Sequence, residues 1–253
     1  MRDLEHWIPD DAVIDDPVIA AIWEGIAWGR LGRADCAWER WEPILDPALA
    51  PWIAAEKGRI LRELGLHDAA EALEAPAFDA CDDVVIRAML AIGLTADAVG
   101  RNDVALARAR LAVAHDLVAS AGAMPMARRQ QLQLAWVSVE VAQVSGEEPP
   151  FDGLPSMDDL GRIDWPEAHT AGTGFHRAKG LLFAAVVRRD ARLLDGALPL
   201  APPILEWAIH LARHDVFGID AVGDARRAWQ VIQPPPGFEA AVAATSVGQR
   251  LAA

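Results

Sequence analysis

The sequence predicts an all-α protein built from stacked antiparallel helix–turn–helix units. Three observations lead to this prediction: small residues recur at a fixed spacing, alanine is the dominant apolar residue, and valine and isoleucine rarely alternate with polar residues. Alanine favours helices, whereas a half-buried strand would show alternation. The hydrophobic content of 53% in 253 residues is enough for a sizeable core.

Three pairs of glycines mark the recurring unit, and the members of each pair are seven residues apart. The pairs are Gly25 and Gly32, Gly58 and Gly65, and Gly93 and Gly100. The second glycines follow one another after 33 and 35 residues, a period typical of helical-hairpin arrays. One hairpin cannot bury its apolar face alone, so we expect neighbouring hairpins to complete the core.

Each position in the unit has a physical reason. The first glycine lies inside a helix and lets a partner helix come close, which offsets its cost of roughly 0.5–1 kcal/mol against alanine. The second glycine is expected to end that helix in the left-handed conformation. An aspartate three residues later is expected to cap the next helix, and an alanine five residues later to let the two helices press together. These residues are Asp35, Asp68 and Asp103, and Ala37, Ala70 and Ala105.

The pattern resembles the tetratricopeptide repeat family over about residues 17–121, with diverged units extending it to 232. The family's small, bulky, glycine and alanine positions correspond to Gly25, Trp28, Gly32 and Ala37, and then to Gly58, Leu61, Gly65 and Ala70. Trp41 fits the later aromatic position, whereas Glu74 and Ala109 depart from it. The resemblance implies a right-handed α-solenoid whose first helices line a concave groove.

The chain is expected to divide into three parts. Residues 1–146 form the helical array, 147–165 a Pro/Gly-rich linker or loop, and 166–253 a helical subdomain that continues or caps the stack. Pro76 is expected to stop the fourth helix, because proline cannot continue one. Helices are expected at 17–31, 35–42, 51–64, 68–75, 82–99, 103–121, 125–145, 166–188, 190–198, 202–213, 221–232 and 238–252.

Charge and cysteine content limit the partners. The net charge of −14 argues against nucleic acid and against an anionic membrane surface. No stretch reaches ~18 uncharged apolar residues, so no transmembrane helix is expected. Cys36 and Cys81 are interpreted as buried thiols, and the N-terminal residues show no signal peptide, so we expect a cytoplasmic protein. The sequence leaves the oligomeric state open.

The resemblance places a partner-binding surface on the first helices. A bidentate arginine fork suits a carboxylate, so an acidic peptide or a free C-terminus is the implied ligand. The alternative is that the arginines pair with Glu24, Glu56 and Glu63 on neighbouring turns. Trp52 is the tryptophan expected to face the partner, whereas Trp28 and Trp41 are expected in the core. The expected partner-binding residues are Ile22, Ile26, Arg30, Trp52, Arg59, Arg62, Arg87 and Leu90.

A second candidate site is a helix face in the C-terminal half. Glu206, His210 and His214 are spaced by four, and a His pair at this spacing can bind a metal. His169 or His176 could complete the ligand set. The alternative interpretation is a solvated polar face, and we expect no cofactor.

The main functional hypothesis is a non-catalytic protein- or peptide-binding module or regulatory adaptor. The nucleotide-binding and hydrolase motifs are missing: no Walker A sequence and no GxSxG is present. The alternative hypothesis is a metal-dependent enzyme centred on the His/Glu helix. A third possibility is the sensing domain of a signalling system.

Overall fold

The computed structural model describes residues 16–121, 125–150 and 170–252, and within these ranges the chain is helical with no strand. This confirms the all-α prediction. Residues 1–15 and most of the predicted linker lie outside the described residues. The helices are α1 Pro17–Arg30, α2 Ala34–Trp41, α3 Ala50–Glu63, α4 His67–Ala80, α5 Val84–Gly100, α6 Val104–Ser120, α7 Pro125–Ser145, α8 Thr170–Arg188, α9 Arg192–Ala197, α10 Pro203–Phe217, α11 Val222–Gln230, α12 Glu239–Ala244 and α13 Ser246–Ala252, with a 3₁₀ turn at Leu198–Leu200.

The chain divides into two compact units. Unit 1 contains residues 1–44 and 155–253, and unit 2 contains residues 45–154. The sequence predicts three parts, with α1 and α2 in the N-terminal one; in the structure these two helices group with the C-terminal helices. Their tie to those helices is partly backbone: Gln233 N–H donates to the Gly32 carbonyl at 2.6 Å, and Ala34 N–H donates to the Gln233 carbonyl at 3.0 Å.

Within unit 1 the helices pack as neighbouring pairs. α1 packs against α2, α8 against α9, and α10 against α11, and α1 also contacts α10. Trp207 of α10 and Trp229 of α11 meet edge to face, with ring centroids 5.3 Å apart. α12 and α13 pack together, and α13 contacts α11.

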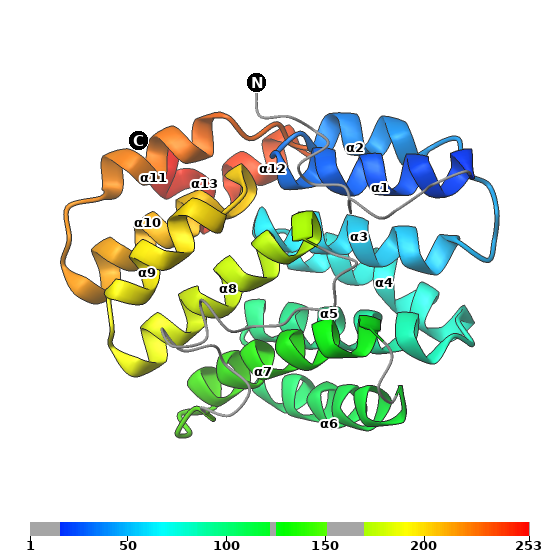
Figure 1. The fold of residues 1–253 in the computed structure, drawn as a ribbon, viewed down its shortest axis with the longest axis horizontal. Helices are drawn as coiled ribbons and strands as arrows, with labels where there is room; N and C mark the ends of the chain where they lie inside the picture. The colour runs from blue at the N-terminus through cyan, green and yellow to red at the C-terminus, as the bar shows by residue number, and fades with distance from the viewer. Residues whose placement is uncertain (1–15, 122–124, 151–169, 253) are drawn as a thin grey trace. The chain divides into compact units, whose positions relative to one another are not determined.

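Unit 2 is organised around α5. This helix packs against α3, α4, α6 and α7 (Figure 1, cyan to green). Nine of its 17 residues are buried. Leu90 joins Ala55 and Cys81 in one core cluster, and Ala98 joins Ala107 and Val141 in another. α5 is thus covered by four helices, whereas a single hairpin would give it only one helical partner.

The turns between paired helices share one backbone geometry. Gly32, Gly65 and Asn102 have positive φ of 77°, 79° and 58°. In each turn, the residue after the left-handed one donates its N–H to the carbonyl of the residue five positions before it, at 2.9 Å. The predicted left-handed role is therefore confirmed for Gly32 and Gly65 but wrong for Gly100, since α5 runs through Gly100 and Asn102 takes that role instead.

A two-residue insertion in α5 explains the difference. The fourth residue of α2, α4 and α6 is a fully buried alanine, namely Ala37, Ala70 and Ala107. The expectation that Ala105 fills this position is wrong: Ala105 is exposed. The eighth residues of the same helices are Trp41, Glu74 and Leu111, so a charged residue occupies a position that elsewhere is apolar.

The first glycines do provide close approach. A Cβ on Gly25 would lie 2.2 Å from Trp41 Nε1, and a Cβ on Gly58 would lie 2.3 Å from Glu74 Oε1. A Cβ on Gly93 would lie 2.6 Å from Glu74 Oε2. The absent side chains therefore make room for large residues of neighbouring helices, as the sequence predicts.

Two local predictions fail for identifiable reasons. Only Asp103 of the three aspartates caps its helix, accepting from Leu106 N–H at 3.1 Å; Asp35 and Asp68 lie inside the first turns of α2 and α4. Pro76 does not stop α4, which continues to Ala80. Pro76 has no N–H to donate to the Ala72 carbonyl. Both residues are exposed, so water can donate to that carbonyl instead.

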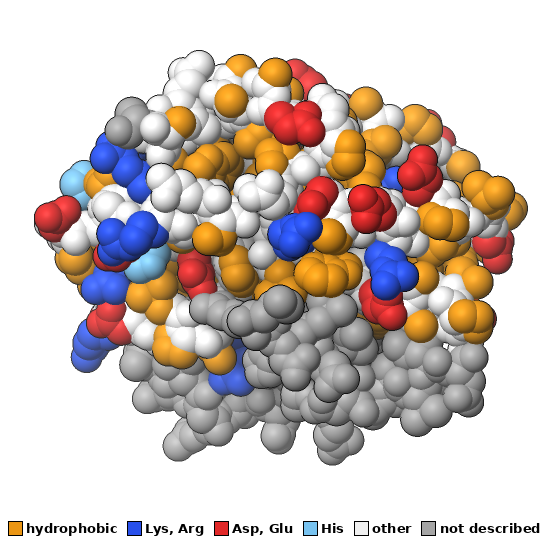
Figure 2. All heavy atoms as spheres, turned by 90° about the horizontal axis from the view of Figure 1, so that it is seen from above, with side chains coloured by type: hydrophobic (Ala, Val, Ile, Leu, Met, Phe, Trp, Pro, Cys, Tyr) orange, Lys and Arg blue, Asp and Glu red, His pale blue; other side chains and the backbone are white. Residues whose placement is uncertain are grey.

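Charged side chains are mixed on the surface. Figure 2 shows acidic and basic groups side by side across the face it displays. Exposed pairs include Arg192 with Asp190 and Arg250 with Asp215. Within the described ranges, no helix combines the length and apolarity that crossing a membrane requires.

Candidate functional site

The apolar residues predicted to face a partner are in the core. Ile22, Ile26 and Leu90 are 0%, 1% and 0% exposed, so the expectation that they line an open groove is wrong. Arg30 is also buried. For Leu90 the reason is the packing of α5 among four other helices, which fills the space that the resemblance assigned to a groove.

The remaining predicted arginines already have contacts within unit 2. Arg59 Nε donates to Glu56 at 2.9 Å, which confirms one of the alternative neighbouring-turn pairs. Glu24, by contrast, pairs with Arg40. The Arg87 guanidinium lies 4.8 Å from the Phe78 ring centre. Partner binding by these residues and by half-buried Trp52 stays a prediction.

Arg62 belongs to a buried charge cluster, which we define as Arg62, Glu74, Asp97 and His67. Arg62 Nη1 donates to Glu74 Oε2 at 2.5 Å and to Asp97 Oδ2 at 3.2 Å. His67 Nδ1 lies 3.4 Å from Asp97 Oδ1. Both carboxylates are fully buried. The cluster joins α3, α4 and α5 through charged side chains.

Burial and the neighbouring charges act in opposite directions on the pKa values of Glu74 and Arg62. Burial raises the pKa of Glu74; the Arg62 guanidinium opposes this, and neighbouring Asp97 adds to it. Burial also acts to lower the pKa of Arg62, but Glu74 and Asp97 outweigh it, so the pKa of Arg62 is raised. Arg62 therefore remains a cation, and Glu74 is the group that favours its protonated form.

Sequence reasoning did not assemble this cluster, although a signal was present. Glu74 occupies a position where the repeat family has an aromatic residue. Arg62 and Asp97 both follow the first glycine of their helix by four residues, so they occupy the same position on α3 and α5. Opposite charges at equivalent positions of α3 and α5, together with a glutamate at a position that is normally aromatic, indicate a buried ion network.

The predicted histidine site lies on α10. Burial lowers the pKa of His210, partly offset by Asp224. Asp215, next to His214, accepts from Arg250 Nη1 at 2.7 Å. Across the described residues, no group of three or more His, Cys, Asp or Glu side chains could hold a metal ion. His176 is buried, and His169 lies outside the described residues. The described residues therefore contain no assembled ligand set for the metal-enzyme alternative.

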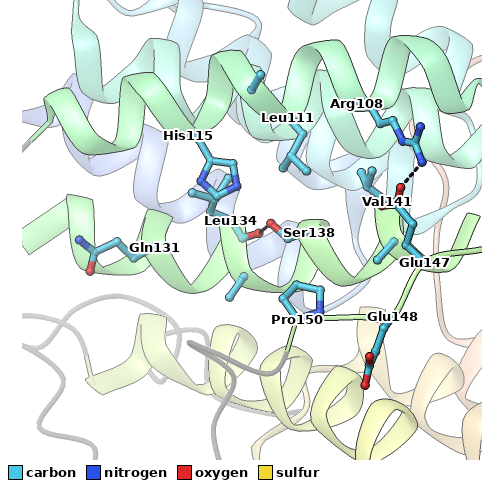
Figure 3. Close-up of a pocket in the computed structure, with 13 residues that line it drawn as sticks. Arg108, Leu111, His115, Gln131, Leu134, Ser138, Val141, Glu147, Glu148 and Pro150 are labelled. Atoms are coloured by element: carbon cyan, nitrogen blue, oxygen red, sulfur yellow. Dashed lines mark hydrogen bonds and ion pairs between the residues drawn. The ribbon is translucent and has the colours of Figure 1, made fainter. Parts of the chain in front are cut away.

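An open groove between α6 and α7 is the clearest candidate site. Its volume is about 790 Å³, and it lies entirely within unit 2. Leu111 comes from α6, and Leu134 and Val141, which are 8% and 3% exposed, reach the base of the groove from α7 (Figure 3). Ala112, Ala135 and Ala142 complete this apolar floor. The Ser138 hydroxyl donates to the Leu134 carbonyl at 2.7 Å, so it is engaged within its own helix.

Polar groups lie at the two ends of the groove (Figure 3). His115 and Gln131 stand at one end, both exposed. At the other end Arg108 pairs with Glu147, and Arg108 Nε also donates to Ser145 Oγ at 3.2 Å. Glu148 follows, also exposed. An apolar floor with polar ends suits non-covalent binding of apolar side chains.

The comparisons with known proteins found no matching family model, no matching curated protein and no matching solved structure. The functional assignment therefore rests on the residues of this chain. The arrangement that those residues offer is a groove with an apolar floor between two helices.

Proposed function

We propose that this protein is a non-catalytic binding module or regulatory adaptor that holds a segment of a partner protein in the α6–α7 groove. The observation that carries this proposal is the groove itself: an open apolar floor between two helices, with charges only at its ends. The resemblance of the glycine pattern to tetratricopeptide repeats supports it, because such helical-hairpin arrays form binding scaffolds.

The size of the groove indicates a short segment. A volume of about 790 Å³ falls within the range of roughly 300–1,000 Å³ typical of ligand sites. It therefore accommodates a few side chains of a peptide. Each fully buried Leu, Ile or Phe side chain contributes roughly 1.5–3 kcal/mol, so two or three contribute roughly 3–9 kcal/mol. Micromolar binding needs about 8 kcal/mol and ordering the peptide costs part of the gain, so we expect affinities between millimolar and micromolar.

The charges of the groove indicate a basic partner segment. Its lining contains two carboxylates, Glu147 and Glu148, against one guanidinium, Arg108, which already pairs with Glu147. The whole chain carries −14. The acidic partner expected from the sequence depended on four arginines. Arg59 and Arg62 bind carboxylates of this chain. Arg87 lies against the Phe78 ring and Arg30 is buried. We therefore assign an apolar segment with a Lys or Arg near Glu148.

A matched pair of variants on α6 tests the assignment. Ala112 lines the groove and Ala109 lies outside it, and both alanines are exposed. Peptides selected from a displayed random library on the full chain are expected to combine apolar residues with a basic one. Ala112→Arg should weaken their binding at least tenfold, because the new side chain fills the groove and repels the basic residue, while Ala109→Arg should leave it unchanged.

Calorimetric titration of the selected peptides measures both effects. Equal binding by the wild type and Ala112→Arg, or selection of purely acidic peptides, would contradict the proposed site. Selection of no peptide that binds better than millimolar would contradict the proposed function itself.

A further inference from the structure

The charge cluster contains more buried negative than positive charge. Glu74 and Asp97 are both fully buried, and both accept from the same nitrogen, Arg62 Nη1, at 2.5 and 3.2 Å. Two carboxylates against one guanidinium leave one excess negative charge. An uncompensated buried carboxylate is strongly unfavourable, and a group in that position takes up a proton instead.

The helices leave no space around the Glu74 carboxyl group. Gly58 of α3 and Gly93 of α5 lie on its two sides, close enough that a Cβ on either would fall 2.3 Å from Oε1 or 2.6 Å from Oε2. Oε1 has no hydrogen-bond partner among the described residues. An ionised Glu74 would therefore have an unsatisfied charged oxygen, whereas a protonated carboxyl group is neutral and can donate its O–H to Asp97.

The other nearby charges do not supply the missing cation. Glu63, beside Arg62 on α3, adds a negative charge. On α4, Glu71 lies one turn before Glu74 and binds both Arg101 and Arg110. His67 is 26% exposed and reaches Asp97 only at 3.4 Å. A proton shared by Glu74 and Asp97, which are hydrogen-bonded to each other, makes the cluster neutral.

We propose that the charge cluster is a proton-linked switch that controls how α4 packs against α3 and α5. With one proton on the Glu74–Asp97 pair the cluster is neutral and the three helices stay packed. Loss of that proton creates a buried negative charge and loosens α4. Because α5 also packs against α6 and α7, the switch acts on a helix that supports the groove.

The direction of the pH effect follows from the Glu74 carboxyl group. Burial, with Asp97 adding to it and Arg62 opposing it, raises the pKa of Glu74 to about 8, above the ordinary value of 4.5. The folded chain therefore holds a proton that the unfolded chain lacks between these values. This contribution to stability is complete below the unfolded pKa and is lost as pH rises through the folded pKa.

Unfolding of three full-length proteins by urea, at pH values from 5.5 to 9, tests the switch. Glu74→Gln keeps the shape of the protonated side chain and cannot ionise. Relative to this variant, the unfolding equilibrium constant of the wild type should rise by up to about tenfold per pH unit until Glu74 is ionised. Glu71→Gln is the matched control on α4 and should differ from the wild type by the same factor at every pH.

An infrared measurement on the wild type gives a second test that needs no variant to fold. At pH 7 the carbonyl stretch of a protonated carboxylic acid should be present, and it should disappear above pH 9. Parallel pH profiles for the wild type and Glu74→Gln, or absence of the protonated-acid band at pH 7, overturns the proposal. Neither outcome depends on peptide binding, so the proposed function is tested separately.

Discussion

Replacing Gly25 by alanine tests the close packing of α1 against α2. The new Cβ would lie 2.2, 2.4 and 2.9 Å from Nε1, Cε2 and Cδ1 of Trp41. These distances are far inside van der Waals contact, so the ring must move. Trp41 is 1% exposed, and its Nε1 donates to the Ile22 carbonyl at 3.1 Å, so movement of the ring also breaks that bond.

The magnitude follows from three terms. Overpacking a well-packed core costs typically 1–3 kcal/mol, that is about 2 here. Loss of the hydrogen bond from Trp41 Nε1 adds about 1 kcal/mol. The better helix propensity of alanine returns about 1 kcal/mol. We therefore expect Gly25→Ala to lower the free energy of unfolding by about 2 kcal/mol, although propensity alone predicts a gain.

Gly223→Ala is a matched control in the same unit. Gly223 lies in α11, and the nearest described atom to its new Cβ is the flexible Arg227 Nη1 at 3.6 Å. Propensity then dominates, and stability should rise by about 0.5–1 kcal/mol. Urea unfolding followed by tryptophan fluorescence and circular dichroism measures both. A Gly25→Ala variant as stable as Gly223→Ala would refute the packing argument.

Two further changes have expected outcomes. Asp83→Ala should lower the free energy of unfolding in urea by about 1 kcal/mol. The Asp83 carboxylate caps α5, accepting from Val85 N–H at 2.8 Å and Ile86 N–H at 2.9 Å. As a control, Asp82→Ala at the exposed neighbouring residue should change stability little. Gly218→Ala should lower the melting temperature by a few degrees, which corresponds to a loss of about 1 kcal/mol in stability. The cause is backbone strain, because φ at this residue is +67° and a new Cβ would contact no described atom within 4 Å. An unchanged melting temperature would show that the turn relaxes.

Residue propensities and glycine spacing predict where most helices lie, but they do not predict every residue at which a helix ends. The glycines at 25, 58 and 93 could be interpreted from the sequence because an absent side chain has a direct consequence for packing. The third turn could not, because the sequence offers both Gly100 and Asn102 for the left-handed position. The choice depends on tertiary contacts: a Cβ on Gly100 would lie 2.2 Å from His67 Nε2 of α4, so this glycine is needed for packing.

The candidate site was less predictable than the fold, since it depends on which helices cover which. The resemblance placed a groove on the first helices, but α7 packs on α5 and closes that side in unit 2. The exposed alanines of α6 give no amphipathic signal, so the α6–α7 groove cannot be recognised from periodicity. The pairing of Glu74 with Arg62 likewise required the positions of three helices.

The backbone bonds of Gln233 to the turn between α1 and α2 have a consequence for synthesis on the ribosome. Unit 2 is continuous in sequence, whereas unit 1 is made from two segments that flank it. The first hairpin emerges early but must wait for Gln233 to emerge before these bonds can form. Unit 2 can complete its own contacts during that interval, so translation order favours folding from the middle of the chain outward.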